Sequence, residues 1–456
     1  MKVLLIQPYN IGYKKLKSPP NAPFGLMCLA AVLRKEGHNV RIFDRNVPDD
    51  PIKETIKKFW PDMIGISTFT GPMILDALNV AKAARDITGA PIVWGGIHPS
   101  LLPYETIKNP YVDIVVVGEG EKTILELSDA VERDKSLEDI KGLVYKENGH
   151  IHTNPERPFI KNLDELPMPA WDLIDLNKYE TLYIFSSRGC PHRCGFCYNE
   201  QYNNKKWRGK SSDRVLEEVN YIVEKCKTKW IVFGDDNFTC NQKRLKDICN
   251  KIIKEDLGIF WRCESRVDYA KRDTLSLMKK AGCHVIFFGI ESASQRILNL
   301  IKKDINISQV KNAFNTCKEL GIAASGAFIV GLPTETKEEL YMTRDLAFEL
   351  PLWGVTVKTY VPYPGSDLYD FCVKNGLFLA PNDLEGWGHI SSWDGVSINV
   401  SQIEGSEIEK VQNEIESKVR AENLPYYFLY GMRRLFDGDS ATVNMFRGMF
   451  SENKLK

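Results

Sequence analysis

The sequence of 456 residues lacks an excess of charge of either sign, because 60 Lys and Arg residues balance 60 Asp and Glu residues. It also lacks a long basic run, so the usual electrostatic footprint of a nucleic-acid-binding protein is missing. No apolar run approaches the roughly 20 residues needed to cross a bilayer. The apolar run within residues 1–8 is too short for a secretory signal and indicates a first strand instead. We therefore expect a soluble, cytoplasmic protein with no nucleic-acid partner and no transmembrane segment.

The sequence has eleven cysteines but lacks a secretory signal, which argues against a disulfide framework. Without a secretory signal they are expected to be reduced thiols. Residues 1–150 contain only Cys28, and Cys372 is the only cysteine beyond Cys317. This scarcity argues against a second iron–sulfur cluster near either end of the chain.

Three cysteines do lie close together: Cys190, Cys194 and Cys197 have the spacing C-x3-C-x2-C. They follow an apolar run at residues 182–185 that predicts a buried strand. Thiolates at this spacing can bind three irons of one 4Fe-4S cluster and leave the fourth iron open. The alternatives are three core cysteines, or a zinc site completed by a distant histidine. Ordinary zinc sites pair C-x2-C units or add a histidine pair, so the pattern favours the cluster.

The sequence RGCPHRCGFCYN around these cysteines resembles the signature of the radical S-adenosylmethionine (SAM) enzymes. Phe196 occupies a position that is usually aromatic in that family. The resemblance implies that the open iron binds the amino and carboxylate groups of SAM. Electron transfer then breaks the S–C5′ bond, and the 5′-deoxyadenosyl radical takes a hydrogen atom from an unactivated carbon. It also implies an external electron donor of the flavodoxin or ferredoxin type.

Residues 1–135 alternate short apolar runs with helical patterns, which predicts an α/β domain with a doubly wound, flavodoxin-like (Rossmann-type) parallel sheet. Ligands of such sheets bind at the carboxyl ends of the strands. The glycine pattern G-x-G-x-x-G is missing after the first strand, which makes a nicotinamide dinucleotide a weak candidate. The expected strands are residues 3–6, 40–43, 63–67, 92–94 and 114–117, and the expected helices are 25–36, 52–59, 72–87, 101–107 and 121–133.

Placed before a radical SAM core, this domain resembles the cobalamin-binding domain of the B12-dependent radical SAM enzymes. The resemblance covers residues 19–44, 65–71, 95–100 and 115–121, and a flavodoxin-like domain that holds no ligand is the alternative. No histidine precedes His38, so the D-x-H-x-x-G ligand of other cobalamin proteins is not available, and we expect the lower face of cobalamin to lack it. The candidate cobalamin-binding residues are Tyr9, Ser67, Thr68, Gly95, Gly96, His98, Gly118 and Glu119.

Residues 136–180 are expected to be a connector that includes a hairpin with Asn148-Gly149 at its turn. Residues 181–370 contain six further strand and helix units, which match the partial (β/α)6 barrel of the radical SAM core. Chemistry in such barrels takes place at the carboxyl ends of the strands. The expected strands are residues 182–185, 230–233, 260–263, 285–288, 324–330 and 355–360.

Polar residues follow these strands, and the family resemblance assigns them to SAM. The second strand is followed by residues for the SAM amino group, and an arginine after the third can pair with a carboxylate through two parallel hydrogen bonds. The fourth strand end suits ribose hydroxyls, and the fifth suits adenine. The candidate SAM-binding residues are Phe196, Asp235, Asp236, Glu264, Ser265, Arg266, Glu291, Ser292 and Gly331.

Residues 371–456 are expected to form a small, mostly helical domain that closes the open side of the barrel, with one helix at 408–419. Trp387 and Trp393 could line a substrate cavity. Together the parts predict an enzyme that uses a 4Fe-4S cluster, SAM and methylcobalamin to transfer a methyl group to an unactivated carbon of a small-molecule or lipid-like substrate. The alternative is a member of the same family that performs ring formation, oxidation or rearrangement. A cobalamin-responsive sensor would have no use for an open iron.

Overall fold

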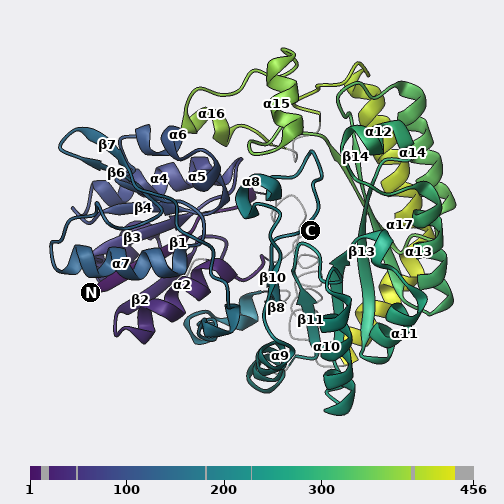
Figure 1. Cartoon of the computed structure of the whole chain (residues 1–456), viewed down its shortest axis with the longest axis horizontal. Helices are drawn as coiled ribbons and strands as arrows, with labels where there is room; N and C mark the ends of the chain where they lie inside the picture. The colour runs from purple at the N-terminus through teal and green to yellow at the C-terminus, as the bar shows by residue number, and fades with distance from the viewer. Residues whose placement is uncertain (12–19, 48–49, 180–181, 227, 392–395, 437–456) are drawn as a thin grey trace, which may run out of the picture. The chain divides into compact units, whose positions relative to one another are not determined.

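The computed structural model describes residues 1–11, 20–47, 50–179, 182–226, 228–391 and 396–436, with side chains up to Asn423. The chain divides into two compact units (Figure 1). The first contains Met1–Lys178, Tyr363–Gly365 and Leu379–Trp393, and the second contains Tyr179–Pro362, Ser366–Phe378 and Asp394–Lys456.

The first unit is built on a seven-stranded sheet with the order β2-β1-β3-β4-β5-β6-β7. Its first five strands pair in parallel in the flavodoxin-like order, as predicted. Strands β1 and β3 are buried along most of their length, as is typical of strands covered on both faces. The strands are β1 Lys2–Gln7, β2 Asn39–Asp44, β3 Met63–Ser67, β4 Ile92–Gly95, β5 Ile114–Val116, β6 Leu143–Glu147 and β7 His150–Thr153, and the helices are α2 Phe24–Lys35, α3 Ile52–Phe59, α4 Met73–Arg85, α5 Ile97–Leu101, α6 Pro103–Lys108 and α7 Gly120–Glu132.

The predicted hairpin is present, but it belongs to the first sheet rather than to a separate connector. Strand β6 pairs antiparallel with β5, and β7 pairs antiparallel with β6. Asn148 and Gly149 have φ of 51° and 79°, the left-handed conformation that a two-residue hairpin turn requires. The expected helix at 101–107 is two short helices, because the residue before Pro103 is forced out of helical geometry.

A short segment from late in the chain packs on the first unit and includes α16, Leu384–Gly388. Trp387 is buried, and a Cβ atom added at Gly388 would lie 2.5 Å from the Leu75 side chain on α4. A Cβ added at Gly71 would lie 2.9 Å from the carbonyl oxygen of Ile390. These close approaches make the segment part of the first unit, so residues 371–456 do not form the single C-terminal domain that was expected.

The second unit contains six parallel strands with the order β15-β14-β13-β12-β11-β8, which agrees with the six predicted strand and helix units. The connecting helices lie along the sheet (Figure 1). The strands are β8 Leu182–Ile184, β11 Trp230–Phe233, β12 Phe260–Ser265, β13 Cys283–Glu291, β14 Ala323–Val330 and β15 Gly354–Thr359, and the helices are α9 Ser212–Cys226, α10 Gln242–Lys254, α11 Arg272–Lys280, α12 Gln295–Leu300, α13 Ile307–Glu319, α14 Lys337–Glu349 and α15 Asp367–Lys374.

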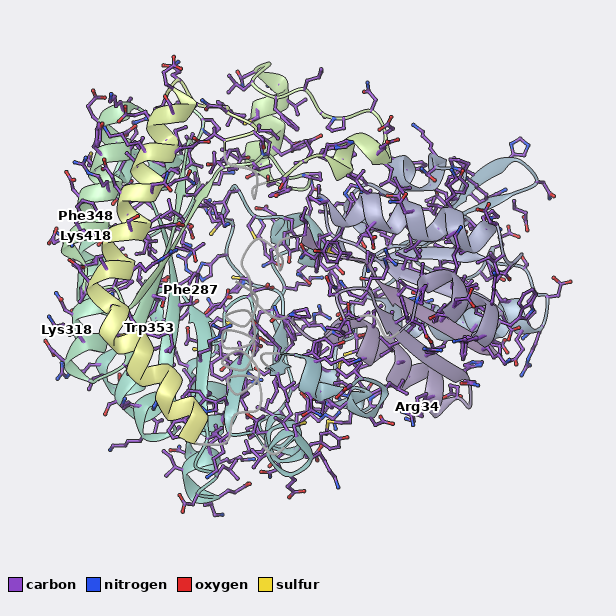
Figure 2. All side chains as sticks on the ribbon, turned by 180° about the vertical axis from the view of Figure 1, so that it is seen from behind. Arg34, Phe287, Lys318, Phe348, Trp353 and Lys418 are labelled. Carbon is purple, nitrogen blue, oxygen red and sulfur yellow. The ribbon has the colours of Figure 1, made fainter. Side chains whose placement is uncertain are left out.

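The last helix of the second unit is α17, Gly405–Phe436, which is longer than the predicted 408–419. It runs beside β15 and α14, where the Lys418 ammonium lies 5.1 Å from the ring centre of Phe348 (Figure 2). Gln412 donates a 3.4 Å hydrogen bond to the carbonyl of Val357, and the Val357 N–H donates one of 3.5 Å to Glu416. Side chains of α17 thereby pair with the backbone of the edge strand.

Two sequence predictions about the C-terminal region have different outcomes. Trp387 lies in the core of the first unit, and Trp393 lies outside the described residues. Among the described helices, none is long and apolar enough to cross a membrane.

Candidate active site

The three predicted ligand cysteines lie on one loop of the second unit, between the short strand β9 (Ser187–Arg188) and α8 (Asn199–Asn203). The loop begins at Gly189, which has a φ of 78° and leaves no room for a side chain, because an added Cβ would lie 2.3 Å from the carbonyl oxygen of Lys206. The Cys197 N–H donates a 3.0 Å bond to the carbonyl of Cys194, and the Gly195 N–H donates a 2.7 Å bond to the carbonyl of Ile301. Backbone contacts therefore set the loop conformation.

The thiols of this loop are half-buried, and burial raises the pKa of Cys197 to about 12 and the pKa values of Cys190 and Cys194 above their usual range. Binding of iron would have to displace these protons. Among the described residues, no three His, Cys, Asp or Glu side chains are close enough to hold a single metal ion. A single loop that carries three thiol donors fits a 4Fe-4S cluster.

Two aspartates follow β11 and have different environments. Asp235 is buried and points back at the start of the cysteine segment, accepting hydrogen bonds from the hydroxyls of Ser186 (2.9 Å) and Ser187. Burial raises its pKa. Asp236 is accessible to water, although protein surrounds much of its carboxyl. Burial and the neighbouring Asp235 raise its pKa to about 6, while a hydrogen bond from the Gly189 backbone opposes the rise. Asp236, rather than Asp235, is free to meet a ligand.

The third strand, β12, ends in Glu264, Ser265 and Arg266. Burial raises the pKa of Glu264 to about 7; Arg262 opposes the rise, and the nearby carboxylates add to it. Ser265 is buried and shares a 2.6 Å hydrogen bond with the Thr239 hydroxyl. Ser265 is therefore occupied by the protein itself.

Arg266 is buried and is held by several partners within the second unit. Its guanidinium pairs with both carboxylate oxygens of Asp268 at 3.0 and 3.3 Å, donates a 2.7 Å bond to the carbonyl of Lys303, and lies 3.6 Å from the sulfur of Cys194. These contacts use four of its five N–H donors. The expected bidentate pairing with a SAM carboxylate would need two donors, so at most a single hydrogen bond fits this geometry.

The fourth strand, β13, ends at Glu291, whose φ of 70° is unusual for a residue with a side chain. Its carboxylate accepts a 2.6 Å hydrogen bond from Lys303, and both residues are buried. The Lys303 ammonium lies 5.7 Å from the ring centre of Phe196 in the cysteine loop. Ser292 is fully buried and contacts the Thr343 hydroxyl at 3.4 Å, so it does not face the same place as Glu291.

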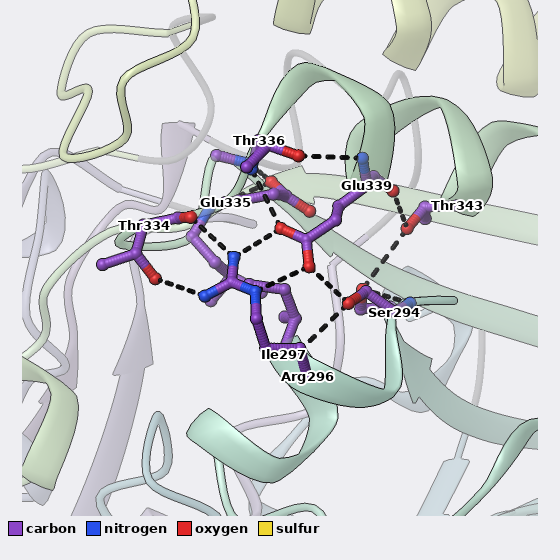
Figure 3. A network of polar contacts seen from close by, with 11 residues as sticks. Ser294, Arg296, Ile297, Thr334, Glu335, Thr336, Glu339 and Thr343 are labelled. Carbon is purple, nitrogen blue, oxygen red and sulfur yellow. Dashed lines mark hydrogen bonds and ion pairs between the residues drawn. The ribbon is translucent and has the colours of Figure 1, made fainter.

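The loop after β14 begins at Gly331, which has a φ of 71°. The buried Glu335 carboxylate accepts hydrogen bonds from the N–H groups of Gly331 (2.7 Å) and Leu332 (3.2 Å). Beside it, Arg296 pairs with Glu339 and donates a 2.7 Å bond to the carbonyl of Thr334 (Figure 3). The arginine and the two glutamates fix the shape of this loop.

In the first unit, two loops at the strand ends pack directly on one another. The Thr68 N–H donates a 3.0 Å bond to the carbonyl of Gly95, and the His98 N–H donates one of 3.3 Å to the carbonyl of Thr68. Gly96 has a φ of 100°, and an added Cβ would lie 2.7 Å from the Thr68 carbonyl oxygen and 3.0 Å from the Ser67 hydroxyl. A Cβ added at Gly95 would have no atom closer than 3.9 Å. Contact with the protein alone is sufficient reason for glycine at position 96.

The same two loops contain buried polar atoms that lack a partner among the described residues. They are the Thr68 hydroxyl and the Nε2 atom of His98. The other ring nitrogen of His98 lies 2.9 Å from the Thr70 hydroxyl, and its ring lies 6.0 Å from that of Trp387. Burial lowers the pKa of His98 to about 4, so the imidazole is neutral at physiological pH. Unpaired buried polar atoms at strand ends are what a ligand with amide or phosphate groups would satisfy.

The other predicted residues of the first unit have structural partners of their own. The Gly118 N–H donates a 2.9 Å bond to the Ser100 hydroxyl, and Glu119 accepts a 2.7 Å bond from the Ile160 N–H. The Tyr9 N–H donates a 2.7 Å bond to the Asp76 carboxylate. All three follow the carboxyl ends of strands, as expected.

Comparisons with known proteins match both units. The family described as the radical SAM superfamily matches residues 184–347, and the family described as the B12 binding domain matches residues 20–128. An uncharacterized methyltransferase of Pyrococcus horikoshii is 40% identical over 84% of this chain and 85% of that protein. The chain belongs to the B12-binding radical SAM enzymes.

Other relatives of this radical SAM enzyme have different names. An anaerobic magnesium-protoporphyrin IX monomethyl ester cyclase of Rubrivivax gelatinosus is 30% identical over 81% of this chain and 69% of that protein. A hopanoid C-3 methylase of Methylococcus capsulatus is 26% identical over 80% of this chain and 72% of that protein. The solved structure of the methyltransferase TsrM from Kitasatospora setae, with cobalamin and a 4Fe-4S cluster bound, has a TM-score of 0.71 and 19% identity, and covers 83% of this chain and 79% of that one.

The cofactors of the radical SAM enzyme are a 4Fe-4S cluster, SAM and cobalamin, in agreement with the sequence prediction. The residues that bind them stay predictions. Sequence reasoning missed Lys303 and Glu335, which the fold brings to the cysteine loop and to the Gly331 loop. Lys303 stands in a run of charged residues, a pattern that ordinarily indicates an exposed surface.

Proposed function

We propose that this radical SAM enzyme transfers a methyl group to an unactivated carbon of a small-molecule or lipid-like substrate. The observation that carries the proposal is the 40% identical methyltransferase relative, whose match extends over most of both proteins and so includes both units. The name of the hopanoid relative supports a lipid-like substrate.

We assign the cluster to Cys190, Cys194 and Cys197. When bound, the cluster supplies the electron that cleaves SAM to the 5′-deoxyadenosyl radical, and cobalamin supplies the methyl group. The protein's own part is to hold the cysteine loop through Gly189 and Gly195.

For SAM, the geometry supports Asp236 more than Asp235 as the partner of the amino group. With a pKa of about 6, Asp236 is mostly ionised at neutral pH and suits a cation. Arg266 retains one donor for the carboxylate. We keep Glu291 and the backbone at Gly331 as candidates for the ribose and adenine, and we leave out Ser265 and Ser292, because their hydroxyls contact other protein side chains.

For cobalamin, we propose the two contacting loops of the first unit, 67–71 and 95–100, with the Thr68 hydroxyl and His98 Nε2 as hydrogen-bonding groups. We expect the electron donor to be a flavodoxin or ferredoxin. All eleven cysteines are free thiols, which supports a cytoplasmic location.

The proposal is tested by counting products. Anaerobically reconstituted protein, with about four irons and four sulfides, is incubated with reductant, cobalamin, a set of candidate small-molecule and lipid-like substrates, and SAM that carries a deuterated methyl group. Methyl transfer predicts S-adenosylhomocysteine together with 5′-deoxyadenosine, and a deuterated methyl in the product. The Cys190→Ala, Cys194→Ala and Cys197→Ala variants should each lose 5′-deoxyadenosine, whereas the buried Cys249→Ala should retain it.

A second candidate function is ring formation, which the 30% identical cyclase relative favours. It predicts 5′-deoxyadenosine without S-adenosylhomocysteine, and a product without a methyl group from SAM. The same experiment therefore separates the two functions.

A further inference from the structure

Four residues after α12, the segment 301–304, contact the cysteine loop at several points. The carbonyl of Ile301 accepts a 2.7 Å hydrogen bond from the Gly195 N–H, and Asp304 pairs with Arg193 at 3.2 Å. Lys302 and Asp304 both have positive φ, 50° and 52°. Residues with side chains adopt this conformation rarely, and it persists where the surrounding structure requires it. The segment is thus held against the loop that carries the cysteines.

Lys303 is the buried member of this segment, with only 5% of its surface exposed. Its ammonium bonds to Glu291 at 2.6 Å and lies 5.7 Å from the Phe196 ring, and its carbonyl accepts the 2.7 Å bond from Arg266. Glu291 is equally buried. A buried ion pair is costly to assemble and contributes little net stability. Its position beside the cysteine loop therefore calls for another explanation.

The pair lies beside the part of the loop that carries Cys194. The Lys303 ammonium is 5.7 Å from the ring centre of Phe196, two residues after Cys194, and the Lys303 carbonyl accepts the 2.7 Å bond from Arg266. A buried cation in this place favours negative charge on the sulfur of Cys194, and the Glu291 carboxylate opposes it. Arg266 adds a direct contact, 3.6 Å from the sulfur.

We propose that the buried Lys303–Glu291 pair sets the reduction potential of the cluster bound at Cys194, with Lys303 making reduction easier and Glu291 making it harder. The proposal rests on the assignment of the cluster to Cys190, Cys194 and Cys197. Lys303 acts at a distance here: its charge affects the cluster, and its contacts help to hold the cysteine loop, without Lys303 itself binding the cluster.

The sign follows from electrostatics. Reduction adds one negative charge to the cluster, and a nearby cation stabilises that charge whereas a nearby carboxylate destabilises it. Burial keeps both effects from being screened by salt. Removal of the cation alone should lower the potential, and removal of the carboxylate alone should raise it.

The test is a potentiometric titration of the reconstituted cluster, followed by electron paramagnetic resonance, in the absence of SAM so that any contact of Glu291 with SAM does not contribute. Lys303→Met should shift the midpoint potential to more negative values, and Glu291→Gln should shift it to more positive values. The double variant should lie between the two, and Lys303→Arg should lie close to the wild type. Lys302→Met is the matched control, because the Lys302 side chain is 45% exposed and pairs with Asp367 at the surface. Its potential should match that of the wild type.

The proposal would be overturned if the midpoint potentials of Lys303→Met and Glu291→Gln both equalled that of the wild type, or if both moved in the same direction. If Lys303→Met does not fold or does not hold four irons, the positive shift of Glu291→Gln alone decides. A wild-type protein that binds no cluster at all would instead refute the cluster assignment, which is a different outcome from a cluster with unchanged potentials.

Discussion

Glu335 provides a test of how the Gly331 loop is held. The residue is fully buried, and one of its carboxylate oxygens accepts the two backbone N–H bonds of the loop. The other oxygen is buried without a partner among the described residues. Burial raises the pKa of the carboxyl from 4.5 to about 7, although the two backbone bonds oppose the rise. The folded protein therefore takes up a proton that the unfolded chain has already lost.

The magnitude follows from linkage between protonation and folding. A pKa difference of this size, at about 1.4 kcal/mol for each pKa unit, corresponds to about 3 kcal/mol. The folded-state pKa is raised, so the stabilisation is fully present below pH 4.5 and is lost as the pH rises through 7. Glu335→Gln keeps an oxygen acceptor for the loop and removes the titration. We expect the free energy of unfolding of the wild type to fall by about 3 kcal/mol relative to this variant across that window.

The measurement is urea unfolding of the full chain, followed by tryptophan fluorescence at a series of pH values from 4.5 to 8. Glu338→Gln is the matched control, because Glu338 is an exposed residue three positions later, in the first turn of α14. It should leave the pH dependence of the wild type unchanged. Parallel curves for the wild type and Glu335→Gln would refute the reasoning, since they would mean that the carboxyl is not buried as the structure has it.

Three further predictions concern the two units. Gly96→Ala should lower the free energy of unfolding by about 1–3 kcal/mol, because its Cβ would overlap the neighbouring loop; Gly95→Ala, measured the same way, should cost much less. The hydrogen bond from Arg296 lowers the pKa of Glu339 from 4.5 to about 2, so this pair should stabilise the protein above pH 4.5 and lose its effect as the pH falls towards 2. Arg296→Met should reduce the loss of unfolding free energy between pH 4.5 and 2. The same loss in this variant as in the wild type would contradict the assignment. Arg266→Ala should weaken SAM binding on the order of ten-fold or more, as measured by equilibrium dialysis, since removal of one charged hydrogen-bond partner costs about 1.5–3 kcal/mol. Equal affinity would mean that the contacts of Arg266 serve the protein alone.

Local patterns predicted most of the fold. The alternation of apolar runs and helical repeats identified the strands of the two larger sheets to within a few residues, because strand and helix periods are properties of neighbouring residues. Asn148-Gly149 indicated the hairpin turn for the same reason. The sequence did not predict that this hairpin pairs with β5, since the choice of a partner strand depends on contacts between distant residues.

By itself the sequence indicated the cysteine loop, and its resemblance to a known signature indicated the class of the protein. Spacing is enough to suggest the cluster, since three thiols within eight residues can reach one cluster in almost any compact loop. Only the tertiary structure decided which residues accompany them. Lys303 reaches the loop from a different strand and helix unit, 106 residues beyond Cys197, and Trp387 joins the first unit from late in the chain. Such pairs form because packing brings distant segments together, and the burial that gives Lys303 and Glu335 their electrostatic effect exists only once the chain has folded.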